Sequence, residues 1–208
     1  MGVTDDTVGR FLDAVGAPTP TPGGGSVSAL VAALSVALSR MVAGLALDKK
    51  GYEDHQADLR QLQASATRVQ ARLTALVEED AKAYEGVLAA MRRPRDTDGE
   101  RSERVARIQE AYRRATEVPL ETMRLGVEAL ELAQAAAEKG NRSATTDAGV
   151  AILLSGAAIR GASLNCRVNL ASIRDGPFRE AAEAEMQALL ERAQSVGHRA
   201  MALVEGRL

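Results

Sequence analysis

Apolar residues recur every three or four positions along most of the chain, which is the spacing of amphipathic helices. Such runs predict helices over about residues 4–16, 53–91, 105–139 and 177–205. In the third run, Pro119 either kinks one long helix or begins a second one. Two further stretches, 26–47 and 150–173, are apolar on every side of a helical wheel, so we expect other helices to enclose them. No stretch alternates apolar and polar residues as a half-buried strand does. The pattern predicts an all-α fold, a helical bundle of about six or seven helices with two enclosed central helices.

The run from 53 to 91 keeps a heptad spacing over its whole length. Its two seams are Leu59, Ala66, Leu73, Asp80 and Val87, and Leu62, Val69, Leu76, Ala83 and Ala90. Only Asp80 is polar in either seam, and a mid-helix position offers it no capping role. A carboxylate at a packed interface costs on the order of several kcal/mol unless it is paired. Asp80 is therefore a candidate site residue, and Tyr84 lies one turn later on the same side.

Each of the two apolar stretches follows a polar loop. In the first loop, Pro22-Gly23-Gly24-Gly25-Ser26, glycines let backbone N–H groups approach a ligand, and we expect Ser26 to cap the following helix. A helix start of this kind is an anion site. The second loop, residues 140–147, contains Asn141, Arg142 and Asp147. The two loops therefore repeat one design, a polar turn followed by an apolar helix.

Composition narrows the class of protein. Of the residues 46% are hydrophobic, but only two Phe, three Tyr and no Trp contribute, so we expect helices packed closely through small side chains. The formal net charge of −2 gives no basic excess for nucleic acid. One cysteine, Cys166, and two distant histidines support neither a disulfide framework nor a metal site. The single cysteine fits a reducing, cytoplasmic setting. We expect no membrane-spanning helix, because residues 26–47 contain many Ser and Ala and are only weakly hydrophobic.

Several polar residues can carry chemistry. They are Ser26, Lys50, Asp80, Tyr84, Asn141, Arg142, Asp147, Asn165 and Asn169. The two helix starts with Lys50 and Arg142 can hold an anion, while Asp80 and Asp147 can face a cation or move a proton. Structural roles explain some of them equally well: Asp147 as a first-turn helix stabiliser and Asn141 as a turn residue. The triple glycine matches neither a P-loop nor a dinucleotide fingerprint.

The order and spacing of these residues resemble a known family. The matching segments are Pro22-Gly23-Gly24-Gly25-Ser26-Val27, Met41-Val42, Lys49-Lys50 with Tyr52, Asp80-Ala81 with Ala83-Tyr84, Val118-Pro119-Leu120, Gly140-Asn141, Thr146-Asp147-Ala148-Gly149, and Asn165 with Asn169-Leu170. They are similar to the cyclodeaminase/cyclohydrolase family, which includes the cyclodeaminase half of formiminotransferase-cyclodeaminase and stand-alone methenyltetrahydrofolate cyclohydrolases. The resemblance covers about residues 8 to 176.

The resemblance implies an all-helical homodimer that binds a tetrahydrofolate derivative in a cleft and needs no metal or further cofactor. Asp80 and Asp147 are then the catalytic candidates. The substrate-binding candidates are Gly24, Gly25, Ser26, Lys50, Tyr84, Asn141, Arg142, Asn165 and Asn169. We expect the two loops and Asp80 to meet in one crevice, where the carboxylate stabilises a positively charged one-carbon bridge.

Alternatives remain open at this stage. The sequence does not separate hydrolysis of 5,10-methenyltetrahydrofolate to 10-formyltetrahydrofolate from cyclisation of 5-formiminotetrahydrofolate with loss of ammonia. A helical interaction module without catalysis predicts no folate binding and tolerance of Asp80→Leu, and membrane insertion predicts partition into detergent. In every case we expect one domain, residues 1–208.

Overall fold

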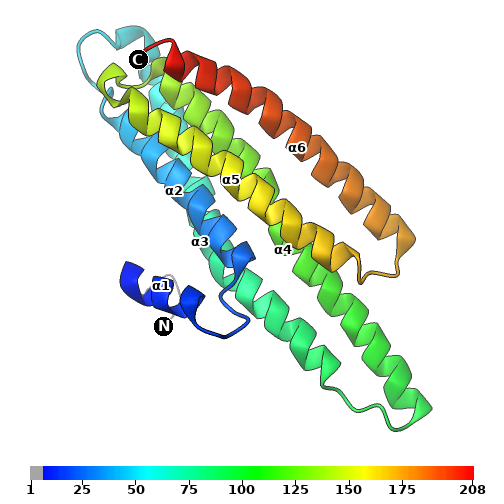
Figure 1. Cartoon of the computed structure of the whole chain (residues 1–208). Coiled ribbons are helices and arrows are strands. Elements are labelled where there is room, and N and C mark those ends of the chain that lie inside the picture. Colours follow the sequence, from blue (N-terminus) through cyan, green and yellow to red (C-terminus); the bar gives the residue numbers. More distant parts are fainter. Residues whose placement is uncertain (1–6) are drawn as a thin grey trace.

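The computed structural model describes residues 7–208, most of which lie in six α-helices (Figure 1). These are α1 (Val8–Gly16), α2 (Gly24–Gly44), α3 (Gln56–Met91), α4 (Asp98–Lys139), α5 (Thr145–Leu170) and α6 (Gly176–Glu205). Two short 3-10 helices, η2 (Glu53–His55) and η3 (Arg142–Ala144), lead into α3 and α5. Residues 7–208 contain no strand, so the all-α prediction is confirmed.

Local signals fix where the helices begin. The Thr7 hydroxyl accepts a hydrogen bond from the Arg10 backbone N–H and caps α1, whereas the start expected near residue 4 lies outside the described residues. Thr97 and Glu100 form a reciprocal capping box at the start of α4. Pro119 lies inside α4, which continues through it as one helix and does not divide into two.

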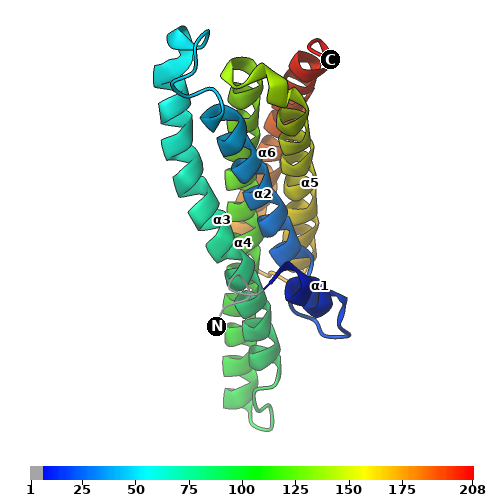
Figure 2. The same ribbon diagram turned by 90° about the vertical axis from the view of Figure 1, so that its left-hand side faces the viewer.

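Four helices form the body of the molecule. Helices α2, α3, α4 and α5 pack around one another, and α6 lies along the groove between α4 and α5 (Figure 1). The α3–α4 hairpin extends beyond the other helices at one end, and α1 lies beside the start of α2 (Figure 2). Helix α1 buries none of its residues. The molecule is thus an elongated bundle whose two ends are formed by different loops.

Small residues let α2 approach its neighbours closely, as the composition predicts. Ala29, Ala32 and Ser35 of α2 are fully buried. The Ser35 hydroxyl donates to the Ala151 carbonyl at 2.8 Å and lies 2.6 Å from the Ser155 hydroxyl, so its polar atom is satisfied inside the core. Helices α2 and α5 therefore pack through a polar contact that needs no long side chain.

The expectation that α2 and α5 are enclosed on all sides is wrong for a single chain. Both helices bury a small-residue face and leave a face of larger apolar residues in solvent. The exposed large residues are Leu34, Met41 and Leu45 on α2, and Val150, Leu153, Leu164 and Val168 on α5. Wheel analysis could not detect this, because the buried and exposed faces are both apolar.

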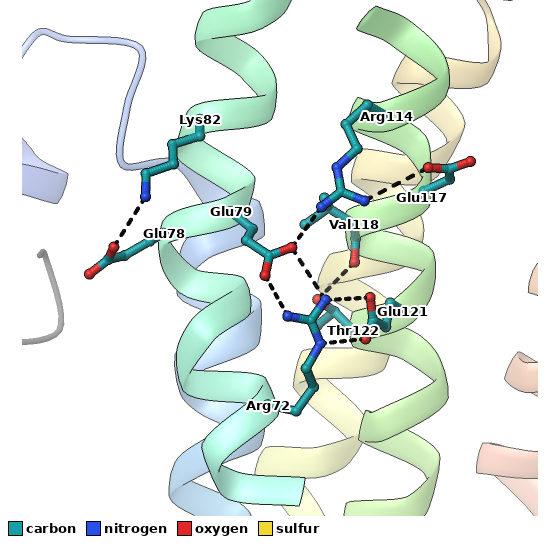
Figure 3. A network of polar contacts seen from close by, with 9 residues as sticks. All are labelled: Arg72, Glu78, Glu79, Lys82, Arg114, Glu117, Val118, Glu121 and Thr122. Atoms are coloured by element: carbon teal, nitrogen blue, oxygen red, sulfur yellow. Dashed lines mark hydrogen bonds and ion pairs between the residues drawn. The ribbon is translucent and has the colours of Figure 1, made fainter. Parts of the chain in front are cut away.

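The outer faces of α3 and α4 are joined by a charged network (Figure 3). Arg72 pairs with Glu79 on its own helix, and its Nε donates to Glu121 of α4 at 2.6 Å. Arg114 of α4 adds a 2.8 Å bond to Glu79. The hydrogen bond from Arg72 is the main cause of the lowered pKa of Glu79. The network stabilises one register of α3 against α4, and its member Glu79 is the residue immediately before Asp80.

Candidate functional site

Asp80 reaches from the middle of α3 to the first turn of α2. The Ser26 backbone N–H donates to Asp80 Oδ2 at 2.8 Å, and the Ser26 hydroxyl donates to the same oxygen at 3.1 Å. The carboxylate thus satisfies a free N–H group of a helix start, where a negative charge is favoured. Asp80 therefore caps a helix other than its own, and the expectation that it has no capping role is wrong.

Gly25 gives the carboxylate its space. A Cβ atom built on Gly25 would lie 2.1 Å from Asp80 Oδ1, closer than any two such atoms approach. The expected cap, Ser26, is instead the third residue of α2, and the N-cap is Gly23, which makes no side-chain hydrogen bond. The physical reason is that Asp80 supplies the acceptor that a capping serine would supply. The glycine run is thus explained by close approach of a side chain from α3.

Burial gives Asp80 unusual electrostatics. Desolvation raises the pKa of its carboxyl above the ordinary value, and the two hydrogen bonds from Ser26 partly oppose this. Within residues 7–208 no cation forms an ion pair with it. A partly dry carboxylate without a counter-ion is suited to stabilise a cationic ligand or to accept a proton.

Other predicted residues lie at the same end of the bundle. The nearest atom to a Cβ built on Gly24 is Asn165 Nδ2, at 3.6 Å. Tyr84 lies one turn beyond Asp80 and is 41% exposed. Asn169 follows Asn165 by one turn and donates to the Ala115 carbonyl at 2.6 Å. We call this group, Gly24, Gly25, Ser26, Asp80, Tyr84, Asn165 and Asn169, the Asp80 cluster.

The remaining predicted residues lie at the other end. The Asn141 backbone N–H donates to the Val42 carbonyl at 3.1 Å, and its side chain donates to the Leu45 carbonyl at 3.0 Å. Its Oδ1 accepts from Ser143 N–H, so the interpretation of Asn141 as a turn residue is confirmed. The group Lys50, Asn141, Arg142 and Asp147 is called the Asn141 cluster below.

The two clusters do not meet within one chain, so the expected single crevice is wrong for the isolated subunit. Ser26 binds Asp80, and Val42 binds Asn141, sixteen positions further along α2. At the helical rise of about 1.5 Å per residue the clusters are about 24 Å apart. The physical reason is that the two loops flank α2 at opposite ends, because α2 and α5 run antiparallel.

Sequence reasoning missed two contacts that organise these clusters. The Tyr52 hydroxyl accepts a hydrogen bond from the Arg142 backbone N–H at 3.0 Å, and so joins the loop that contains Lys50 to η3. The other is the Gly25–Asp80 contact, whose only sequence signal was the coincidence of a glycine run and an acid in a packed seam. In the described part of the chain, no group of three or more His, Cys, Asp or Glu side chains is arranged to hold a metal.

Two grooves of the single chain contain no residue of either cluster, although one of them is lined by Lys82 and Ala83, which lie between Asp80 and Tyr84. A groove of about 540 Å³ runs between α5 and α6, and one of about 430 Å³ runs between α3 and α4. Neither groove is lined by a residue of the Asp80 cluster or the Asn141 cluster.

Comparison with known proteins adds an independent finding. A family model described as formiminotransferase-cyclodeaminase matches residues 7–204. A methenyltetrahydrofolate cyclohydrolase from Methylorubrum extorquens is 37% identical over 204 residues, which are 98% of this chain and 98% of that protein. A formimidoyltransferase-cyclodeaminase from Rattus norvegicus is 32% identical over 207 residues, and the chain spans 38% of its length. The crystal structure of a formiminotetrahydrofolate cyclodeaminase from Thermotoga maritima matches with a TM-score of 0.89 at 28% identity, covering 98% of each chain.

Proposed function

The chain belongs to the formiminotransferase-cyclodeaminase family, and from that premise we propose that it hydrolyses 5,10-methenyltetrahydrofolate to 10-formyltetrahydrofolate. The observation that carries the proposal is the Asp80 carboxylate, partly buried, held by Ser26 and without a counter-ion in residues 7–208. The cyclohydrolase relative of the same length supports this choice of reaction. We further propose that residues 1–208 act as one domain, in a cytoplasmic homodimer.

The chemistry of the substrate fits this carboxylate. The methenyl bridge is a delocalised cation, which the negative charge of Asp80 stabilises. Water attacks the bridge carbon, and Asp80 accepts a proton from that water as the carbon–oxygen bond forms. The bond from that carbon to N5 then breaks, N5 takes a proton from Asp80, and the hydroxyl proton of the intermediate passes to solvent. The formyl group remains on N10.

The burial of Asp80 serves the same step. A general base works best when its pKa is near the operating pH. Desolvation raises the pKa of Asp80 toward that range, while the Ser26 hydrogen bonds hold the carboxylate in one orientation. The helix start formed by Gly24, Gly25 and Ser26 and the side chains of Asn165 and Asn169 are proposed to bind the pterin ring or its carboxylate tail.

Cyclisation of 5-formiminotetrahydrofolate is the second candidate. In that reaction N10 attacks the formimino carbon, and ammonia leaves after taking a proton, for which Asp147 is the proposed donor. It is favoured by the match to the Thermotoga maritima cyclodeaminase, which covers 98% of both chains. The same cation-stabilising carboxylate serves both reactions, because the methenyl bridge is substrate in one and product in the other.

The test offers purified protein each folate separately and follows the absorbance of the methenyl group. A falling signal from 5,10-methenyltetrahydrofolate identifies the hydrolase, and a rising signal from 5-formiminotetrahydrofolate identifies the cyclodeaminase. Asp80→Asn should lower turnover by roughly 100 to 10,000-fold, the contribution of a general acid–base group. Glu85→Gln, an exposed acid-to-amide change on the same helix, is the control. An active Asp80→Asn variant, or no reaction with either folate, contradicts the proposal.

A further inference from the structure

We propose that Pro119 is a positioning residue for the candidate site: it leaves the Ala115 carbonyl without its helical donor, and this carbonyl fixes the carboxamide of Asn169 so that its oxygen faces the substrate. The inference rests on the proposed function, because the ligand concerned is the folate of the same site. It gives a role to α4, which contributes no residue to the Asp80 cluster. A proline inside a helix is costly, and Pro119 lies in the interior of the 42-residue helix α4.

The proline removes one donor from the hydrogen-bond ladder of α4. In an α-helix the carbonyl of one residue accepts from the N–H four residues later, so the regular donor to the Ala115 carbonyl is residue 119. Proline has no N–H, and its ring also presses against that carbonyl. Ala115 and Pro119 are both buried, in the stretch of α4 that Figure 3 shows between Arg114 and Thr122. A buried carbonyl without a donor is unfavourable, so a replacement donor is needed.

Asn169 of α5 supplies the replacement donor. Its Nδ2 donates to the Ala115 carbonyl oxygen at 2.6 Å, across the contact between α4 and α5. Chemistry fixes which amide atom this is, because a carbonyl oxygen only accepts and the atom bonded to it must be the nitrogen. The carboxamide of Asn169 is therefore held in one orientation by a backbone atom of another helix.

This bond leaves the carboxamide oxygen of Asn169 for a ligand. The side chain is half-buried, and its Oδ1 keeps contact with solvent and bonds to no donor within residues 7–208. Asn165, one turn earlier, repeats the arrangement: its Nδ2 donates to the Gly161 carbonyl at 3.0 Å, and no donor in the described residues bonds to its Oδ1. Helix α5 thus presents two amide oxygens, one turn apart, at the Asp80 end of the bundle.

Two acceptors select the part of a ligand that donates hydrogen bonds. One edge of the pterin ring carries a ring N–H beside an amino group, whereas the carboxylate tail of folate only accepts. Amide oxygens fixed in this way favour the ring and disfavour the tail. We therefore assign the pterin ring to Asn165 and Asn169, which leaves the helix start at Ser26 for the tail.

A purely structural pair is the competing explanation. In that case Pro119 and Asn169 only complete the contact between α4 and α5, and weaker folate binding in a variant would follow from lost stability. The two explanations differ for Pro119→Ala. The added N–H should strengthen the helix, but it also takes the Ala115 carbonyl and frees the Asn169 amide to rotate. Positioning therefore predicts weaker binding in a chain that is no less stable.

Steady-state kinetics, with the folate that the wild-type chain transforms, tests the positioning role. We expect Pro119→Ala to raise KM by roughly 2- to 10-fold, the value of one hydrogen bond. The kcat should stay within about twofold, because the ring is bound equally in the ground state and the transition state.

Val118→Ala is the matched control for these kinetics. Val118 is buried beside Pro119, so its truncation leaves a cavity but does not alter the bond between Ala115 and Asn169. This variant should be less stable in urea and keep the wild-type KM. An unchanged KM in Pro119→Ala, or an equal rise of KM in Val118→Ala, would overturn the positioning role.

A double-mutant cycle of urea unfolding tests the hydrogen bond without any folate. Asn169→Ala leaves the Ala115 carbonyl without a donor, so it should lower the folding equilibrium constant by roughly 5- to 100-fold. In the Pro119→Ala background the restored N–H satisfies that carbonyl, and the factor should be at least about threefold smaller. Equal factors in both backgrounds would refute the exchange of donors.

The two experiments separate this inference from the proposed function. A wild-type chain that transforms neither folate refutes the proposed function, and the positioning role toward that substrate with it. A wild-type chain that transforms a folate, with additive unfolding in the cycle and an unchanged KM in Pro119→Ala, refutes the inference alone. Non-additive unfolding together with a raised KM supports it.

Discussion

At the scale of single residues, the contact between the middle of α3 and the start of α2 depends jointly on Asp80, Ser26 and Gly25. Position 80 of the α3 seam carries a carboxylate, where the other seam positions carry apolar side chains. This carboxylate accepts a hydrogen bond from the Ser26 backbone N–H. This is possible only because Gly25 has no Cβ in the way. The cost of burying the carboxylate is offset in part by the positive end of α2. Each residue is therefore constrained by the other two.

Gly25→Ala is expected to disrupt this arrangement. The added Cβ would lie 2.1 Å from Asp80 Oδ1, so the carboxylate must move and lose its hydrogen bonds to Ser26. Overpacking of this kind lowers the free energy of unfolding by about 1–3 kcal/mol, measured by urea denaturation. Gly24→Ala is the stability control, because its Cβ makes an ordinary 3.6 Å contact with Asn165. Equal stability of the two variants would contradict the close packing of Gly25 on Asp80.

The raised pKa of Asp80 predicts how stability depends on pH. Burial is the main cause of the shift, so the folded chain holds this proton more tightly than the unfolded chain does. The contribution of Asp80 is therefore most favourable below its unfolded pKa and is lost as the pH rises through its folded pKa. We expect Asp80→Asn, which does not titrate, to gain stability relative to wild type as the pH rises above the ordinary pKa of an aspartate, 3.8.

Urea denaturation of both proteins at several pH values measures this difference, and the other titrating groups cancel in the comparison. A stability difference that stays constant or reverses with pH would show that hydrogen bonding, and not desolvation, dominates at Asp80. The variant should be more stable and less active, as expected where a functional group costs stability.

The heptad seam was enough to identify Asp80 as exceptional, but not to identify its partner. A helical repeat shows which residues share a face, and the seam residues of α3 are buried as predicted. It does not show which neighbouring element meets that face. The start of α2 lies 54 positions before Asp80, and no local pattern connects them. The assumption that Ser26 must cap its own helix concealed the contact.

At the scale of elements, the pairing of α3 and α4 positions Asp80. The Arg72 network connects the two helices (Figure 3), and its member Glu79 is the residue immediately before Asp80. Arg72 has carboxylates on both sides, which raises the pKa of its guanidinium above its already high value. Removing the cation leaves Glu121 without this partner and brings its charge close to that of Glu79.

Arg72→Met is expected to lower the free energy of unfolding by about 1–2 kcal/mol, since a partly exposed network contributes more than an isolated surface pair. Methionine keeps the apolar stem and removes only the charge. Arg68→Met is the matched control: it faces Glu128 across the same two helices, but its side chain is 61% exposed, so its loss should stay below about 0.5 kcal/mol. Comparable losses for both variants in chemical denaturation would contradict a special role for Arg72.

Most element boundaries followed from local chemistry. Gly16 ends α1 and the 53–91 pattern became η2 and α3, whereas α5 (Thr145–Leu170) both begins and ends earlier than the predicted 150–173 stretch. Pro119 left two alternatives, which only packing could decide, because a proline is compatible both with a helix start and with a tolerated interior position. The apolar wheels of α2 and α5 were detected, but their burial depends on which neighbours a single chain supplies.

At the scale of the whole molecule, two similar loops lie at opposite ends of a bundle. Their likeness in sequence predicted a shared crevice, but the length of α2 separates them by about 24 Å. Sequence patterns predicted the two loops and the two apolar helices, but not how they lie relative to one another. The antiparallel course of α2 and α5 places the two loops at opposite ends of the bundle. The exposed apolar residues of α2 and α5 support the homodimer proposed above.

Leu34→Asp is the substitution that tests this at the level of assembly. Leu34 is 50% exposed in the single chain, so aspartate there should leave the helices folded, as circular dichroism will show. In the proposed homodimer the exposed apolar residues of α2 and α5 are the expected contact surface, and a carboxylate buried in an apolar contact loses its hydration. The variant should therefore be monomeric in light scattering.

We expect the homodimer to be the active form, so the turnover of this variant should fall with its dimer content. Ala188→Asp, at an exposed position of α6 and not among the exposed apolar residues of α2 and α5, should remain dimeric and active. Raising the protein concentration should restore part of the activity of Leu34→Asp, since association depends on concentration while a defect within one chain does not. A folded, monomeric Leu34→Asp variant with full turnover would show that one subunit contains the whole site.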